Sequence, residues 1–146
     1  MKDIINLIYG GKPGVDEETL NTTENSLGAS FPSQYKELVK LINNCEIGEW
    51  IFYPIKDPKN IRKTWDDIVR NNQPSVRFTH IPEDLIQFAE NGTGNKLCFK
   101  INNNKMEEAI YFWDCETGLT EKIADNLKQF IQQEYELDNE VDLDDE

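Results

Sequence analysis

The chain has 146 residues, of which 28 are acidic and 15 are basic, so its formal net charge is −13 at pH 7. Its three Trp, seven Phe and five Tyr bury enough area to form the core of one folded domain. An acidic protein repels nucleic-acid backbones and anionic lipid, and it attracts basic proteins. The composition therefore argues against direct nucleic-acid or membrane binding and favours a basic protein partner.

The first half of the chain is predicted to be mainly helical. Glycine and proline divide it into segments, and apolar residues recur at helical spacing within them. The predicted helices span 3–9, 16–26, 32–44 and 57–70, and an aromatic run at 50–53 favours a strand. Trp65 shares one face of the 57–70 helix with Ile61, Ile68 and Val69, so we expect Trp65 in the core.

The second half is predicted to be an antiparallel meander followed by a helix. Short alternating runs at 84–89, 96–101 and 109–113 are separated by turn residues, and the final helix covers 123–135. The order of elements predicts one α+β domain over residues 1–135, with a mainly antiparallel sheet and helices packed on one face.

The C-terminal segment, residues 136–146, carries seven acidic residues and no basic one. Removing these seven leaves 21 of the 28 acidic residues against the same 15 basic ones, so the rest of the chain is acidic as well. We expect this segment to be a mobile tail.

A cytoplasmic location is expected for this chain. No apolar run approaches the roughly 20 residues that cross a bilayer, and residues 1–8 (MKDIINLI) lack the small-residue cleavage site of a signal peptide.

The cysteines are predicted to be buried free thiols. Cys45, Cys98 and Cys115 are widely spaced, and His80 is the single histidine. A zinc site takes four such ligands, or three and a water, and no Cys-x-x-Cys is present. We therefore expect no metal, no cofactor and no disulfide framework.

Three motifs occur in a fixed order along the chain. The first joins a glycine helix break to a helix start with proline: Glu24…Leu27-Gly28…Phe31-Pro32…Tyr35…Leu38. The second is the turn FAENGTGN at 88–95, and the third is the strand IYFWD at 110–114, before an aromatic helix. Together, over about residues 16–135, they resemble the SUKH superfamily, the domain of Smi/Knr-type yeast cell-wall-assembly regulators and of many bacterial immunity proteins.

The resemblance implies a function in binding and not in catalysis. Bacterial members of the superfamily are typically encoded beside polymorphic toxins, and each neutralises the toxic domain of its neighbour, often a nuclease. Asn95 stands where the family frequently has an acidic residue, so no carboxylate role is carried over to that position.

Candidate catalytic groups are sparse, and we predict that the protein is not an enzyme. The 92–94 turn is not followed by the Lys-Ser/Thr of a phosphate-binding loop. His80 has no nucleophile pattern around it, and we interpret it as a surface histidine. The adjacent carboxylates are interpreted as solvated: Asp66-Asp67, Glu83-Asp84 and Glu107-Glu108. An enzyme would need carboxylates with shifted pKa values in a deep pocket.

Tryptophans beside carboxylates are candidate anchors for a basic partner. Trp113 alternates away from Ile110 and Phe112, so we expect it on the open face of the sheet, and Trp50 begins a strand beside Glu49. The predicted partner-binding residues are Glu49, Trp50, Asp57, Asp66, Asp67, Trp113, Asp114 and Glu116.

Two functions follow from these observations. The first is an immunity protein that binds and neutralises a cognate toxin domain by occupying its basic cleft. The second is a regulatory or scaffolding domain of the cell-wall-assembly-regulator type, in which the acidic tail does more of the binding. Deletion of residues 136–146 separates them, because a small loss of function favours the first and a complete loss favours the second.

Overall fold

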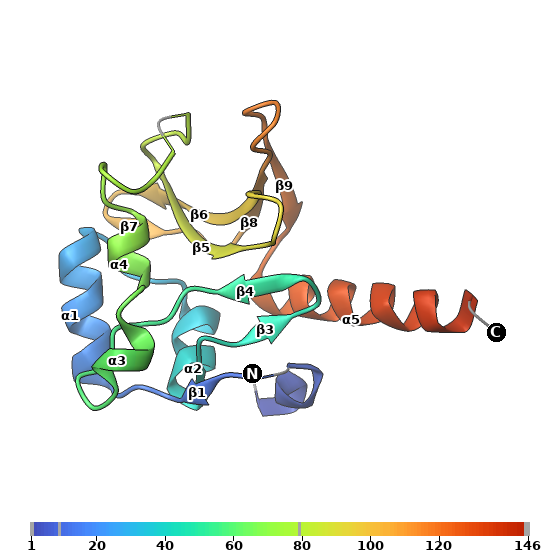
Figure 1. Cartoon of the computed structure of the whole chain (residues 1–146), viewed down its shortest axis with the longest axis horizontal. Helices are drawn as coiled ribbons and strands as arrows, with labels where there is room; N and C mark the ends of the chain where they lie inside the picture. The colour runs from blue at the N-terminus through green and yellow to red at the C-terminus, as the bar shows by residue number, and fades with distance from the viewer. Residues whose placement is uncertain (1, 9, 79, 145–146) are drawn as a thin grey trace.

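The computed structural model describes residues 2–8, 10–78 and 80–144 (Figure 1). An antiparallel sheet lies at its centre, with strand order β3-β4-β5-β6-β8-β9 and with β7 paired to β6. These strands are β3 (Glu46–Ile47), β4 (Trp50–Phe52), β5 (Leu85–Glu90), β6 (Lys96–Asn102), β7 (Lys105–Met106), β8 (Ile110–Trp113) and β9 (Thr120–Ala124). Two further short strands, β1 (Lys12–Pro13) and β2 (Ile42–Asn43), pair with each other.

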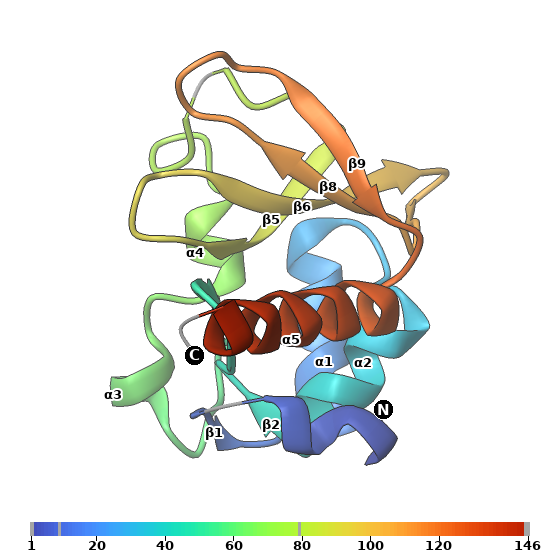
Figure 2. The same cartoon turned by 90° about the vertical axis from the view of Figure 1, so that its right-hand side faces the viewer.

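The three longer helices lie below the curled sheet as drawn in Figures 1 and 2. They are α1 (Glu17–Leu27), α2 (Ser33–Leu41) and α5 (Leu127–Asp144), and a 3-10 helix at Lys2–Leu7 contacts α5. Two short helices, α3 (Ile61–Thr64) and α4 (Ile68–Asn71), stand beside α1. The predicted α+β domain, with helices packed on one face of an antiparallel sheet, is confirmed.

Aromatic rings fill the space between the sheet and the helices. Phe88 of β5 and Phe99 of β6 stack with ring centroids 4.0 Å apart. Tyr35 of α2 packs edge-on against both rings, at 6.1 and 5.4 Å. Burial raises the pKa of Tyr35, and its hydroxyl has no hydrogen-bond partner among the residues that the structure describes. Tyr35 therefore serves as a neutral, largely apolar core residue that joins α2 to the sheet.

The first motif forms the connection between α1 and α2. Gly28 ends α1 with φ 78°, and its N–H donates to the carbonyl of Glu24. The buried Glu24 carboxylate accepts a hydrogen bond from the Phe31 N–H at 2.7 Å and pairs with Lys36 at 3.3 Å. The Ser33 N–H at the start of α2 donates to the carboxylate of Glu108. These motif residues therefore determine the path of the backbone between α1 and α2.

The predicted 57–70 helix is wrong in one respect, because it is two single turns instead of one helix. Asp67 has an extended backbone and accepts a hydrogen bond from the Arg70 N–H, so it caps a new helix at Ile68. The break turns the preceding residues outward. Trp65 is 57% exposed, so the prediction that it lies in the core is wrong.

The end of the chain also differs from the prediction. Residues 120–124 form the edge strand β9, which the sequence analysis missed, and α5 begins only at Leu127. The helix continues past the expected end at Tyr135 to Asp144. The mobility of residues 136–146 stays a prediction.

The second face of the sheet is covered by the loop between α4 and β5. Ile81, Leu85, Cys98 and Trp113 form a small second core on this face. Phe78 of the loop stacks on Trp113 with ring centroids 5.7 Å apart. Trp113 is consequently 1% exposed, and the prediction that it lies on an open face is wrong.

We expect Glu24→Ala to lower the free energy of unfolding by about 2 kcal/mol, because the substitution leaves the buried Phe31 N–H without an acceptor. Chemical denaturation monitored by circular dichroism measures this change. Asn25→Ala, at an exposed position of the same helix, is the matched control and should change stability little. Equal effects of the two substitutions would contradict a capping role for Glu24.

Candidate functional site

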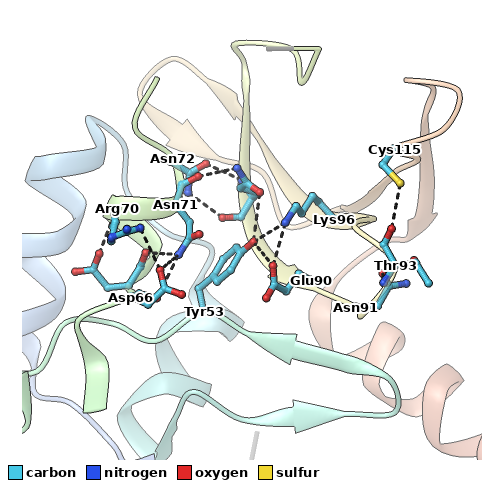
Figure 3. A network of polar contacts seen from close by, with 12 residues as sticks. Tyr53, Asp66, Arg70, Asn71, Asn72, Glu90, Asn91, Thr93, Lys96 and Cys115 are labelled. Atoms are coloured by element: carbon cyan, nitrogen blue, oxygen red, sulfur yellow. Dashed lines mark hydrogen bonds and ion pairs between the residues drawn. The ribbon is translucent and has the colours of Figure 1, made fainter. Parts of the chain in front are cut away.

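Three turns meet at one edge of the sheet, and we call this surface the turn edge. It consists of Glu49 in the β3–β4 turn, residues 91–95 in the β5–β6 turn and residues 114–119 in the β8–β9 turn. The Asn91 side chain donates to the Glu49 carboxylate at 3.4 Å. The Cys115 N–H donates to the Asn95 side chain at 3.0 Å, and its thiol donates to the Thr93 carbonyl at 3.3 Å (Figure 3). Side-chain contacts therefore hold the three turns together.

The turn edge is acidic and carries one exposed apolar side chain. Glu49 and Glu116 are exposed and Asp114 is half-buried, and no Lys or Arg occurs in residues 44–49, 90–95 or 114–119. Lys96, which follows the β5–β6 turn, is paired with Glu90 at 3.0 Å. Leu119 is 70% exposed. Carboxylates and an exposed leucine on one edge suit a basic protein surface with an apolar pocket.

The structure divides the eight predicted partner-binding residues into two groups. Five belong to the turn edge or its support, namely Glu49, Trp50, Trp113, Asp114 and Glu116, whereas Asp57, Asp66 and Asp67 lie on the far side of the molecule. Trp50 and Trp113 are 3% and 1% exposed, so neither reaches the surface. They pack beneath the turns, and Trp50 meets Phe112 edge-on at 5.9 Å.

The sequence analysis missed Leu119. An isolated leucine directly after Thr-Gly, outside any alternating apolar run, was the available signal. A leucine in that position does not belong to the buried face of a strand or helix, so it is expected to be exposed.

A groove of about 1000 Å³ lies on the opposite side, between α1 and the segment that contains α3 and α4. Trp65 and Ile61 line it and are 57% and 53% exposed. The Arg70 guanidinium lies 4.8 Å from the centroid of the Trp65 ring and holds the indole by a cation–π contact. In Figure 1, α1, α3 and α4 stand at the left and the β3–β4 and β5–β6 turns at the right.

The charges that line the groove are mixed, because Asp16, Glu18, Asp57 and Asp67 stand among Lys56, Lys59 and Arg70. Lys56 and Lys59 line the groove and Arg62 and Lys63 lie on the adjoining helix α3; within the described part of the chain none of the four forms an ion pair. Two of the nearby carboxylates have partners. Asp57 accepts from the Lys59 N–H at 3.0 Å, and Asp66 pairs with Arg70 at 3.5 Å.

Two of the adjacent carboxylate pairs contain a structural member, which corrects the interpretation of all six as solvated acids. Asp67 is 5% exposed and caps α4. Desolvation raises the pKa of Asp67, against the opposing effects of the Arg70 N–H and the charge of Lys56. Glu108 accepts hydrogen bonds from the N–H and the hydroxyl of Ser33. His80 is exposed, as predicted.

A buried polar network joins the groove to the sheet (Figure 3). Lys96 donates to the Tyr53 hydroxyl at 2.9 Å and to Glu90 at 3.0 Å, and Tyr53 donates to Glu90 at 2.9 Å. Asn72, at the end of α4, exchanges hydrogen bonds with the backbone of Gln87 in β5 at 2.9 and 3.0 Å. Because these groups satisfy one another, the network is a structural tie between α4 and the sheet and not a reactive centre.

Within residues 2–8, 10–78 and 80–144, no three His, Cys, Asp or Glu side chains are placed to hold a metal ion. In the same residues, no helix combines the length and the apolar character needed to cross a membrane.

The comparison with known protein families identifies the domain. The family described as "SUKH_5: SMI1-KNR4 cell-wall" matches residues 1–136. The chain belongs to the SUKH family. No curated protein matches the chain. The SUKH match includes both the turn edge and the groove.

We expect Asp67→Ala to destabilise this SUKH domain by about 1 kcal/mol, because the helix cap is lost. Asp67→Asn keeps an acceptor and removes a charge whose pKa is raised in the folded state. A raised pKa means that the ionised carboxylate opposes folding at neutral pH, so stability falls as pH rises through this pKa. Asp67→Asn should therefore equal or exceed the wild type at pH 7, and the difference should vanish in acid. Thermal denaturation across pH tests this, and equal losses in both variants would contradict it.

We expect one fast-reacting thiol per native SUKH domain, at Cys115. Burial raises the pKa of both the Cys45 and the Cys98 thiols to about 12, so neither forms thiolate near pH 8, and neither is accessible. Cys115 is half-buried. Labelling with a chromogenic disulfide reagent should detect one thiol in the native protein and all three after denaturation, and Cys115→Ser should abolish the native signal. Fast labelling of a second thiol would contradict this assignment.

Proposed function

We propose that this SUKH domain is an immunity protein that binds and neutralises a basic toxin domain, with the turn edge as the contact surface. The observation that supports this most directly is that Glu49 of the β3–β4 turn lies on the same edge of the sheet as Asp114 and Glu116 of the β8–β9 turn, which also carries the exposed Leu119, in segments without a cation. The SUKH family includes immunity proteins, and the chain as a whole carries a charge of −13.

The chemistry of the turn edge suits a nuclease as the toxin. A nuclease holds phosphates in a basic cleft. Carboxylates on a protruding edge can occupy such a cleft and exclude the nucleic acid, both sterically and by matching its charge. Long-range attraction raises the association rate, and burial of an apolar side chain slows dissociation.

Rigidity of the turn edge favours tight binding. The turns are held by the Asn91–Glu49, Cys115–Asn95 and Cys115–Thr93 contacts, and Asp114 accepts a hydrogen bond from the Glu116 N–H at 2.8 Å. A surface that is ordered before binding loses less conformational entropy when the complex forms. The buried Trp50 and Trp113 contribute by supporting these turns from below.

A second candidate is the regulatory or scaffolding role of the cell-wall-assembly-regulator type. One observation favours it: α5 continues beyond the body of the domain as far as Asp144 and so carries residues 136–144 of the acidic segment outward (Figure 1). In that role the segment would recruit several partners weakly. Its removal would abolish binding, whereas removal would have little effect on an immunity protein that uses the turn edge.

The test is co-expression with the C-terminal domain of the protein encoded by the neighbouring gene, followed by affinity measurement. We expect the wild type to protect cells and to form a complex, and Glu49→Lys with Glu116→Lys to weaken affinity at least about tenfold, mainly through a slower, salt-dependent association. Leu119→Asp should instead speed dissociation.

Asp66→Lys is the matched control, because Asp66 was predicted by the same reasoning but lies on the far side, where its carboxylate makes exposed contacts with Arg70 and Asn71. It should bind like the wild type. Unchanged affinity of the turn-edge variants would rule out this surface. Absence of both complex and protection would rule out the immunity function for that toxin.

A further inference from the structure

The register of the sheet places two exposed apolar side chains beside the turn edge. Directly paired residues of adjacent strands point to the same face of a sheet, and one continuous row of pairs crosses the six strands near the turns. This row, which we call the outer row, consists of Glu46, Ile51, Glu90, Lys96, Trp113 and Thr120. It lies on the second face of the sheet, the face that carries the small core around Trp113.

The first exposed side chain of the outer row is Ile51 of β4. Its neighbours Trp50 and Phe52 point to the helices and are 3% and 1% exposed, whereas Ile51 points to the second face and is 44% exposed. The α4–β5 loop therefore leaves this end of the second face open to solvent.

The second exposed side chain is Phe78, which lies on the outer row from the α4–β5 loop. Its ring stacks on Trp113 with centroids 5.7 Å apart, and its centroid lies 5.4 Å from the Lys96 amino nitrogen. The backbone beside it is tied down, because the Phe78 carbonyl accepts a hydrogen bond from the Ile81 N–H at 3.3 Å. Phe78 is nevertheless 47% exposed. The part of the ring that does not contact the sheet therefore faces outward.

We propose that the toxin contact extends from the turn edge onto the outer row, with Ile51 and Phe78 as its apolar anchors. This inference rests on the proposed function. The two surfaces are continuous, since Ile51 follows Glu49 by two residues and Phe78 stacks on the residue directly before Asp114.

The charges of the outer row suit the same basic partner. Glu46 and Glu90 outnumber Lys96, the single cation of the row. Lys96 is already engaged, because it donates to Glu90 at 3.0 Å and to the Tyr53 hydroxyl at 2.9 Å (Figure 3). Arg77, the cation next to Phe78 in the chain, directs its guanidinium to two backbone carbonyls of its own loop. A basic surface therefore meets unneutralised acids and no free cation on this row.

The apolar anchors supply what the carboxylates of the turn edge do not. Exposed ion pairs are screened by water and salt and contribute little affinity. Side chains that become fully buried in a complex, inside a ring of contacts that excludes water, carry most of the binding energy. Ile51 and Phe78 are half-exposed in the free protein, so each has apolar area left to bury. Such burial acts mainly on dissociation, whereas long-range charge acts mainly on association.

The experiment measures the binding kinetics of the full-length protein with the C-terminal domain of the protein encoded by the neighbouring gene. Ile51→Ser and Phe78→Ser should each speed dissociation about tenfold and leave the association rate and its salt dependence unchanged. Glu49→Lys with Glu116→Lys should show the opposite pattern.

Two variants on the far side are the matched controls. Ile61 and Trp65 are 53% and 57% exposed but line the groove, so Ile61→Ser and Trp65→Ser should dissociate like the wild type. Phe78→Tyr keeps the ring that stacks on Trp113 and should do the same. Thermal denaturation of each variant reports its stability. Ile51 lies in a strand and not in the loop, so Ile51→Ser tests the row even where Phe78→Ser loosens the loop.

The outcomes separate this inference from the proposed function. Dissociation of Ile51→Ser at the wild-type rate would overturn the inference, and so would equal effects of the far-side controls. If the turn-edge variants alone lost affinity, the immunity function would stand and the wider contact would be rejected. If the wild type formed no complex, both would be rejected for that domain.

Discussion

The packing of Tyr35 against the stacked Phe88 and Phe99 is the interaction on which the rest of the structure depends. Phe88 and Phe99 lie on adjacent central strands, and Tyr35 is the residue of α2 that reaches both. This contact fixes the distance between the helices and the sheet. It also determines the side of the molecule on which the β3–β4, β5–β6 and β8–β9 turns lie, and these turns form the acidic surface.

The acidic turn edge follows from this arrangement. Turns between antiparallel strands lie at the ends of the strands. Carboxylates that are far apart in the sequence, such as Glu49 and Glu116, therefore both lie on the turn edge. The cations at 56–63 belong to the long connection between β4 and β5, which passes to the other side. The turn edge therefore carries acids without cations, whereas the groove on the other side carries charges of both signs.

The tryptophans show where reasoning from periodicity fails. Trp65 fits a helical stripe and is exposed, whereas Trp113 faces away from its apolar neighbours and is buried. In the first case the Asp67 cap interrupts the helix. The short-range hydrogen bond of this cap outweighs the preference of the apolar stripe for one continuous helix. In the second, Phe78, 35 residues earlier in the numbering, stacks on the indole from a loop with no regular structure.

Local patterns in the sequence were sufficient for the α+β class, the α1–α2 connection at Gly28 and the central strands, because glycine conformation, helix capping and alternation act over a few residues. They also identified Glu49, Asp114 and Glu116 as acids of interest. Only the tertiary structure decided that these acids share an edge, that Leu119 is exposed beside two of them and that Trp65 lines a groove. Those facts depend on contacts between residues far apart in the chain, and no local pattern records which distant segment will cover a side chain.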